Sequence, residues 1–75
     1  MENAVRERRE RLNIRVEDLA RDAGVTPTFI YMVETGSRVP SLPTARRIAE
    51  SLRTTVDALF FEPILTQSEK RGRTQ

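Results

Sequence analysis

Cysteine and histidine are both absent from the sequence. Without cysteine the chain has no disulfides and no thiolate metal ligands, and without histidine it lacks the side chain that most often acts as a general base at neutral pH. Its one lysine, Lys70, lies near the C-terminal end. A catalytic site needs a base and a nucleophile that converge, and the sequence shows no such set. We therefore expect that the protein is not an enzyme and uses no metal and no cofactor.

Long apolar runs are absent as well. A membrane-spanning helix needs roughly eighteen or more apolar residues in a row, and no such run occurs. The N-terminal segment MENAVRERRERL is charged, unlike the basic cap and apolar stretch of a secretion signal. We expect a soluble, unprocessed intracellular chain. With 75 residues it has room for one small domain, whose stability is modest unless a partner adds to it.

The overall charge says little about a partner. The chain holds 13 basic and 11 acidic residues, which leaves a formal net charge of +2. A basic surface must therefore come from where the basic residues lie and not from their number. All of them except Lys70 are arginine. Arginine suits bidentate contacts to phosphate, and codon bias in a GC-rich genome explains this composition equally well.

The stretch from Gly24 to Gly36, GVTPTFIYMVETG, carries the clearest local pattern. Thr26 suits the N-cap of a helix, Pro27 suits its first turn, and Gly36 suits the left-handed residue just past its end. This predicts a helix of about nine residues. Helical spacing puts part of it inward and part of it outward: Ile30 and Val33 on the inner face with Phe29 beside them, and Thr28, Tyr31 and Met32 on the outer faces.

The preceding segment, VEDLARDAG, predicts a second short helix over residues 16–23. Leu19, Ala20 and Ala23 point inward, and the small alanines allow a close crossing with the next helix. Its start is poorly capped, because Arg15 offers no acceptor. Only about three residues, one of them a glycine, separate the two helices. Two helices joined in this way form a helix-turn-helix.

Three further helices complete the prediction. Each follows a residue that can cap it: the first runs from Asn3 to about Leu12, the fourth from Ser41 to about Leu52, and the last covers 56–61 after Thr55. The fourth has an apolar stripe at helical spacing, formed by Leu42, Ala45, Ile48, Ala49 and Leu52. No useful alternating strand pattern occurs. The predicted fold is all-α, a compact five-helix domain over residues 1–61, followed by a polar tail over 62–75.

Arg9 differs from the other charged residues of the first helix. Most of them form a solvated outer face, whereas Arg9 lies beside the apolar stripe of Val5 and Leu12. A guanidinium at the edge of the core needs a partner. Glu34 is the acidic residue that the pattern offers, so we predict a structural ion pair between Arg9 and Glu34.

From about Asn3 to Phe61 the sequence resembles the lambda-repressor-like family of phage and bacterial transcription regulators, also called the Cro or XRE family. The matching residues, in order and at short spacings, are Leu19-Ala20, Gly24-Val25-Thr26, Ile30, Val33, Glu34, Gly36, Pro40-Ser41-Leu42, Ile48-Ala49, Leu52, Val56-Asp57 and Leu59. The resemblance implies a homodimer that binds double-stranded DNA at a palindromic operator, with the third helix in the major groove. It also implies a cytoplasmic, nucleoid-associated protein of a prokaryote or phage.

The resemblance assigns residues to the DNA interface. Base contacts fall on Pro27, Thr28, Tyr31 and Met32, and phosphate contacts on Thr26, Ser37, Arg38 and Arg15. The hydroxyl of Thr28 can bond a base edge, and the apolar groups of the other three base-reading residues can pack on a thymine methyl. For each of these residues the alternative is a solvated side chain, and for Thr26 it is a helix cap alone.

Three features depart from the family pattern. The third helix offers no arginine, glutamine or asparagine on its outer face, which shifts the expected readout toward DNA shape, apolar contacts or the following loop. Val16 stands where many relatives have a phosphate-binding glutamine. Arg53 stands where relatives often have glycine, so the fourth helix either ends without a left-handed residue or holds an arginine in a strained one.

The end of the domain is more apolar than a monomer requires, because of Phe60, Phe61, Ile64 and Leu65. Exposed apolar clusters mark interfaces, so we expect the homodimer contact here, with packing inside the chain as the alternative. A second function class also fits the near-neutral charge and the Tyr31 and Met32 face. In that case the domain is an antitoxin-like or antirepressor-like module whose third helix binds a regulatory protein partner.

Overall fold

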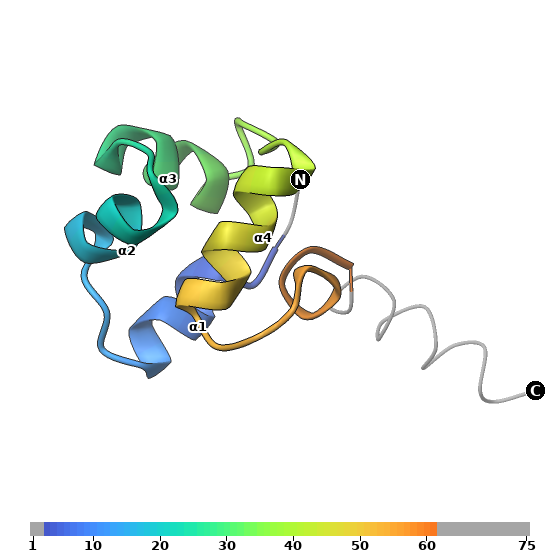
Figure 1. Ribbon diagram of the computed structural model, residues 1–75, viewed down its shortest axis with the longest axis horizontal. Coiled ribbons are helices and arrows are strands. Elements are labelled where there is room, and N and C mark those ends of the chain that lie inside the picture. The colour runs from blue at the N-terminus through green and yellow to red at the C-terminus, as the bar shows by residue number, and fades with distance from the viewer. Residues whose placement is uncertain (1–2, 62–75) are drawn as a thin grey trace, which may run out of the picture.

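The computed structural model describes residues 3–61, and every regular element in that range is helical (Figure 1). The elements are α1 (Val5–Arg11), α2 (Val16–Ala23), α3 (Pro27–Glu34), α4 (Leu42–Ser51) and the short π-helical turn η1 (Asp57–Phe61). The predicted all-α, five-helix fold is confirmed. None of the described helices is long and apolar enough to cross a membrane. The predicted tail, with Ile64 and Leu65, lies outside the described residues.

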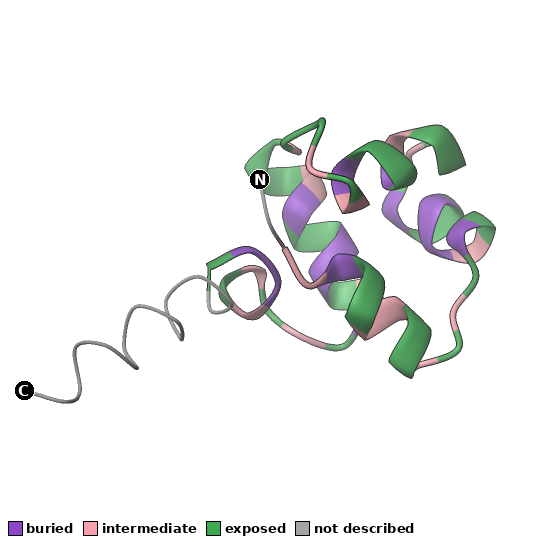
Figure 2. Ribbon diagram, turned by 180° about the vertical axis from the view of Figure 1, so that it is seen from behind, coloured by how far each residue is buried: buried purple, intermediate pink, exposed green. Residues whose placement is uncertain are grey.

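The core lies between α4 and the other helices. In Figure 1, α2 and α3 lie to one side of α4 and η1 to the other, and α2 packs against both α3 and α4. Seen from behind in Figure 2, the buried residues of the helices face the interior. Fully enclosed side chains come from each of the five elements and from Leu52, the residue just after α4. They are Val5, Leu19, Ile30, Val33, Ile48, Leu52 and Leu59.

Leu42 was expected in this core and is not there. It is 61% exposed, whereas Ala45, Ile48, Ala49 and Leu52 are buried as predicted. Leu42 is the first residue of α4, nearly one turn before the first residue of that helix that reaches the core. Helical periodicity identifies the face on which a side chain lies, but it does not show where along the helix the neighbouring helices end.

The predicted caps are present, with one change. Ser41 Oγ accepts the Thr44 N–H at 3.4 Å, and Thr55 Oγ1 accepts the Ala58 N–H at 3.1 Å. At α1 the N-cap position belongs to Ala4, while the Asn3 side chain still accepts the Val5 N–H at 3.1 Å. The helix boundaries therefore shift by one or two residues from those predicted.

The N-terminal segment connects two distant elements. The Asn3 side-chain amide donates to the Val33 carbonyl near the end of α3 at 2.8 Å, and the Ala4 N–H donates to the Leu59 carbonyl of η1 at 2.8 Å. Both bonds join residues far apart in sequence. The first residues of the described chain therefore hold α3 and η1 in place.

The end of α4 holds Arg53 in a left-handed conformation, with φ of 57°. This is the strained alternative left open by the sequence; Asn13, at φ of 58°, adopts a similar conformation that was not predicted. The side chain of Arg8 crosses from α1 and donates to the Leu52 carbonyl at 2.9 Å and to the Arg53 carbonyl at 3.0 Å. Arg8 thus satisfies carbonyl groups that a helix end leaves without an intrahelical partner.

Replacing Arg53 with glycine is expected to raise the free energy of unfolding by about 0.5 to 1 kcal/mol. Glycine adopts the left-handed region without the penalty that a Cβ carries, and part of this gain is lost to its greater freedom in the unfolded chain. Arg53→Ala is the control, because alanine removes the same charge but keeps the Cβ. Urea unfolding with equal midpoints for the two variants would contradict the assignment of strain.

Candidate nucleic-acid interface

The inner face of α3 is buried in the core, and its outer face is exposed to solvent. Thr26 Oγ1 accepts the Phe29 N–H at 3.1 Å, and Pro27 occupies the first turn as predicted. Ile30 and Val33 have no exposed surface. Gly36, at φ of 82°, follows the C-terminal end of the helix, which agrees with the predicted left-handed position. Because its inner face is anchored in the core, the orientation of the outer face is fixed by the fold.

The four predicted base-reading residues share this outer face. Pro27 and Thr28 are exposed, Tyr31 is 53% exposed and Met32 is 37% exposed. The outer face of α3 offers a ligand one hydroxyl group at Thr28, one phenol at Tyr31 and an apolar surface. Such a surface can bond single acceptor or donor groups and can pack against methyl groups, but it cannot form the bidentate pairs that arginine, asparagine and glutamine make with bases.

The loop after α3 folds back on the Met32 carbonyl and thereby positions Arg38. This oxygen accepts the backbone N–H of Ser37 at 3.0 Å and that of Arg38 at 3.1 Å, and it lies 3.2 Å from the hydroxyls of Thr35 and Ser37. The guanidinium carbon of Arg38 is 5.5 Å from the centroid of the Phe29 ring, a cation–π distance. Arg38 is exposed and next to α3, whereas the Ser37 hydroxyl already has partners within the loop.

A cleft of about 420 Å³ lies between α1, the start of α2, and α3. It brings together Arg15 and Tyr31, both predicted, with Arg6 and Thr35, which were not predicted from the sequence. Arg15 occupies the N-cap position of α2, and no side chain caps that helix. Backbone N–H groups at a helix start attract anions. Arg6 also bonds Glu10 at 3.1 Å, so its charge is shared with an acid.

Arg9 and Glu34 form the ion pair expected from the sequence. Arg9 Nε donates to Glu34 Oε2 at 2.6 Å, and Arg9 Nη2 donates to Glu34 Oε1 at 3.3 Å. The Arg9 side chain is 12% exposed and the Glu34 side chain 4%. The hydrogen bond with Glu34 raises the pKa of Arg9, against the effect of burial, which lowers it. The pair joins α1 to the C-terminal end of α3 and so fixes that end of the helix.

The residues predicted at a dimer interface lie in different surroundings. Phe60 is 4% exposed and belongs to the core of its own chain, whereas Phe61 is 45% exposed. Ile64 and Leu65 lie outside the described residues. Packing inside the chain therefore accounts for Phe60, and the homodimer itself stays a prediction. Among the described residues, no group of acidic, histidine or cysteine side chains is arranged to hold a metal ion.

Two solved structures share this fold. The chain is similar to the clp gene regulator ClgR from Corynebacterium glutamicum, with a TM-score of 0.77 and 18% identity over 95% of this chain and 76% of the other. It is also similar to a chain of the SinR protein/SinI protein complex, with a TM-score of 0.71 and 23% identity over 92% of this chain and 71% of the other. No curated protein sequence matches significantly.

The sequence itself matches a family model. The helix-turn-helix model HTH_3 covers residues 5–59, which include α1 through most of η1 and therefore nearly all of the described fold. Within this range α2, the turn at Gly24 and α3 form the helix-turn-helix of the fold. The chain belongs to this helix-turn-helix family, the Cro/C1 type of DNA-binding transcription regulators.

Proposed function

We propose that this protein is a sequence-specific transcription regulator that binds double-stranded DNA as a homodimer, with α3 in the major groove of each half-site. The observation that carries the proposal is the arrangement of α3. Its inner face is locked in the core by Ile30 and Val33, its outer face is exposed, and Arg15 and Arg38 lie beside it. A presented helix flanked by cations is suited to a groove bordered by phosphates.

In this proposal different residues contact the DNA bases and the DNA phosphates. Base contacts come from Pro27, Thr28, Tyr31 and Met32. Phosphate contacts come from Thr26, Ser37, Arg38 and Arg15. The hydroxyl of Thr26 accepts within its own helix and keeps its proton for a phosphate oxygen. The apolar side chains of α3 favour operators with thymine methyl groups opposite Met32 and Tyr31, and sequence-dependent DNA shape supplies further discrimination.

Fluorescence anisotropy with random duplex at low salt is the direct test. We expect salt-dependent binding of random duplex and much tighter binding of sites selected from a random pool. Selected sites should contain two half-sites of inverted sequence about 34 Å apart, one turn of the double helix. A chain that binds no duplex even at low salt would exclude the proposal.

Replacing Arg38 with alanine is expected to weaken binding to all duplex sequences by a similar factor and to lower the magnitude of the salt slope by about one. The reason is that a contact to phosphate releases counterions but reads no base. Arg11→Gln is the matched control, since it removes one positive charge from the last turn of α1 on an exposed residue. Unequal losses across sequences would indicate that Arg38 reads a base instead.

A protein-interaction module remains a second candidate, on one observation. Tyr31 and Met32 give α3 an exposed apolar surface, and the SinR protein/SinI protein complex shares the fold. In this second function the domain is an antitoxin-like or antirepressor-like module that binds a regulatory protein through the outer face of α3. The anisotropy experiment separates the two functions, because only a DNA-binding protein responds to random duplex.

A further inference from the structure

Phe29 is an aromatic residue of α3 that belongs neither to the fully enclosed core nor to the base-reading set. Its side chain is half-buried and packs against the core. The guanidinium of Arg38 lies over its ring, with the central carbon 5.5 Å from the ring centroid. A cation within about 6 Å of a centroid and over the ring face is attracted by the ring's quadrupole. Phe29 therefore connects the core of the domain with a cation of the loop after α3.

The contact with the ring leaves the charge of Arg38 available. Within residues 3–61 the Arg38 guanidinium makes no ion pair and no hydrogen bond. Arg6 and Arg9 differ, because each of them is bonded to a carboxylate that balances its charge. An aromatic ring carries no net charge, so Phe29 restrains the guanidinium without neutralising it. A phosphate can then form charge-assisted hydrogen bonds with the same N–H groups.

The backbone of Arg38 is bonded to the same helix. Its N–H donates to the Met32 carbonyl at 3.1 Å, and the N–H of Ser37 donates to the same oxygen at 3.0 Å. Met32 follows Phe29 by three residues, so the two partners of Arg38 lie on neighbouring turns of α3. The helix that carries the base-reading residues therefore holds Arg38 at both its backbone and its guanidinium.

We propose that Phe29 is a positioning residue for DNA binding, whose ring holds the Arg38 guanidinium beside α3 for contact with the DNA backbone. This inference rests on the proposed function and adds a residue to it. A freely rotating arginine side chain loses conformational freedom when a phosphate immobilises it. Because the ring already restricts Arg38 in the free protein, less freedom is lost on binding. The same charge therefore contributes more affinity than it would on an unsupported side chain.

The role of the ring is tested with Phe29→Leu in the full chain. Leucine removes the ring and keeps an apolar side chain at the edge of the core. In fluorescence anisotropy with random duplex at low salt, the affinity of this variant should fall about two- to fivefold, which corresponds to one exposed cation–π contact. Phe29→Tyr keeps the ring and should bind as tightly as the natural chain. Circular dichroism at the assay temperature shows whether each variant is folded.

A double-mutant cycle separates positioning from packing. In the Arg38→Ala background there is no guanidinium to position, so Phe29→Leu should cause no further loss of affinity. Loss of packing alone would instead lower the affinity by the same factor in both backgrounds. Any loss of stability that Phe29→Leu causes is present in both backgrounds, so it cancels when the two factors are compared.

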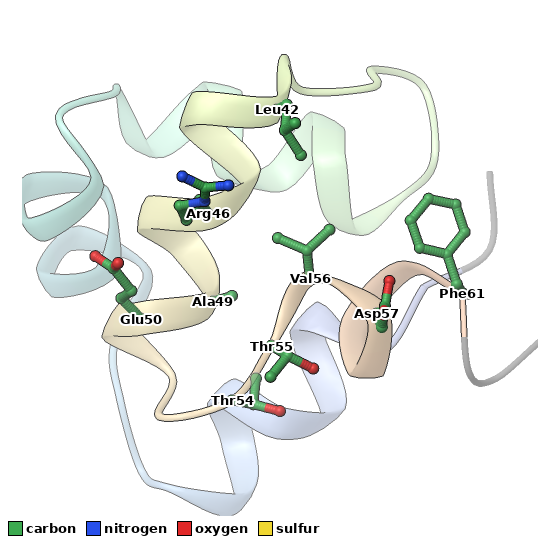
Figure 3. Close-up of a pocket in the computed structure, with 9 residues that line it drawn as sticks. All are labelled: Leu42, Arg46, Ala49, Glu50, Thr54, Thr55, Val56, Asp57 and Phe61. Carbon is green, nitrogen blue, oxygen red and sulfur yellow. The ribbon is translucent and has the colours of Figure 1, made fainter.

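Val56→Ala is the matched control for the cycle. Val56 is also partly buried and packs against the core, but it lines a cleft of about 470 Å³ between α4 and η1 (Figure 3). The turn η1 lies on the opposite side of α4 from α3 (Figure 1). Shortening Val56 should therefore change the affinity by the same factor whether or not Arg38 is present.

Three results would overturn the inference while leaving the proposed DNA function intact. They are a Phe29→Leu variant that binds duplex as tightly as the natural chain, a loss of equal size with and without Arg38, and a Phe29→Tyr variant as weak as Phe29→Leu. A natural chain that binds no duplex at all would exclude the proposed function, and this inference would fail with it.

Discussion

Replacing Glu34 with glutamine is expected to lower the free energy of unfolding by about 3 kcal/mol or more, a large share of the stability of so small a domain. Glutamine fills nearly the same volume, so the loss comes from charge. The Arg9 guanidinium would stay in its site, where only 12% of its side chain is exposed, with no carboxylate bonded to it. Its bond to the Ile14 carbonyl at 3.0 Å would remain but does not neutralise the charge.

Glu7→Gln is the matched control for this experiment. Glu7 lies 3.9 Å from Arg11, and both side chains are more than half exposed, so losing this pair should cost less than about 1 kcal/mol. Urea unfolding followed by circular dichroism measures both variants. A third variant, Arg9→Met with Glu34→Leu, should recover most of the loss because no buried charge remains. Equal midpoints for the Glu34 and Glu7 variants would show that the pair does not stabilise the fold.

Replacing Thr28 with glutamate is expected to lower the affinity for every duplex by about 100-fold, which is about 2.7 kcal/mol of binding free energy. Thr28 lies in the first turn of α3 on its exposed face, where the proposed binding mode puts it against base edges bordered by phosphates. A carboxylate there meets like charge. The same carboxylate favours the folded chain, since α3 has no acidic residue in its first turn.

The opposite effects on folding and binding make this variant informative. Thermal unfolding should show a domain at least as stable as the natural one, so that lost affinity cannot be attributed to unfolding. Arg11→Gln changes the net charge by the same amount and should reduce affinity only slightly. If the glutamate variant retains the natural affinity for selected sites, α3 does not enter the groove, and the second candidate function gains support.

Much of the fold could be predicted because its signals are local. Thr26, Pro27 and Gly36 each act on the backbone within one turn, and they define the ends of α3 in the structure as the sequence indicated. The pair of Arg9 and Glu34 could be predicted because a charge beside an apolar stripe needs a partner. Residues that begin or end a helix, and a charge beside an apolar stripe, can both be recognised in a single sequence.

The features that escaped prediction depend on distant neighbours. Whether Leu42 faces the core depends on where α4 passes beyond its neighbours, and the contact of Arg8 with the end of α4 joins residues 44 apart in sequence. Phe60 and Phe61 look alike in sequence, yet one is buried and the other exposed, because consecutive residues of a helical turn point in different directions and only the neighbouring elements decide which direction is the core. Arg6 could not be predicted at the candidate site, because the cleft that it lines forms only when α1, α2 and α3 come together.

The hydrogen bond from the Ala4 N–H to the Leu59 carbonyl has a consequence for the synthesis of the chain. A nascent chain leaves the ribosome with its N-terminus first, and domains generally fold as units once their sequence is available. Here the first described turn can reach its final place only after η1 has emerged, because η1 holds its acceptor and packs against α1. The helix-turn-helix unit of α2 and α3 has emerged well before that point, but α1 then still lacks its contact with η1. This domain should therefore acquire its full stability only after η1 has emerged, which arrest at successive chain lengths combined with limited proteolysis would measure.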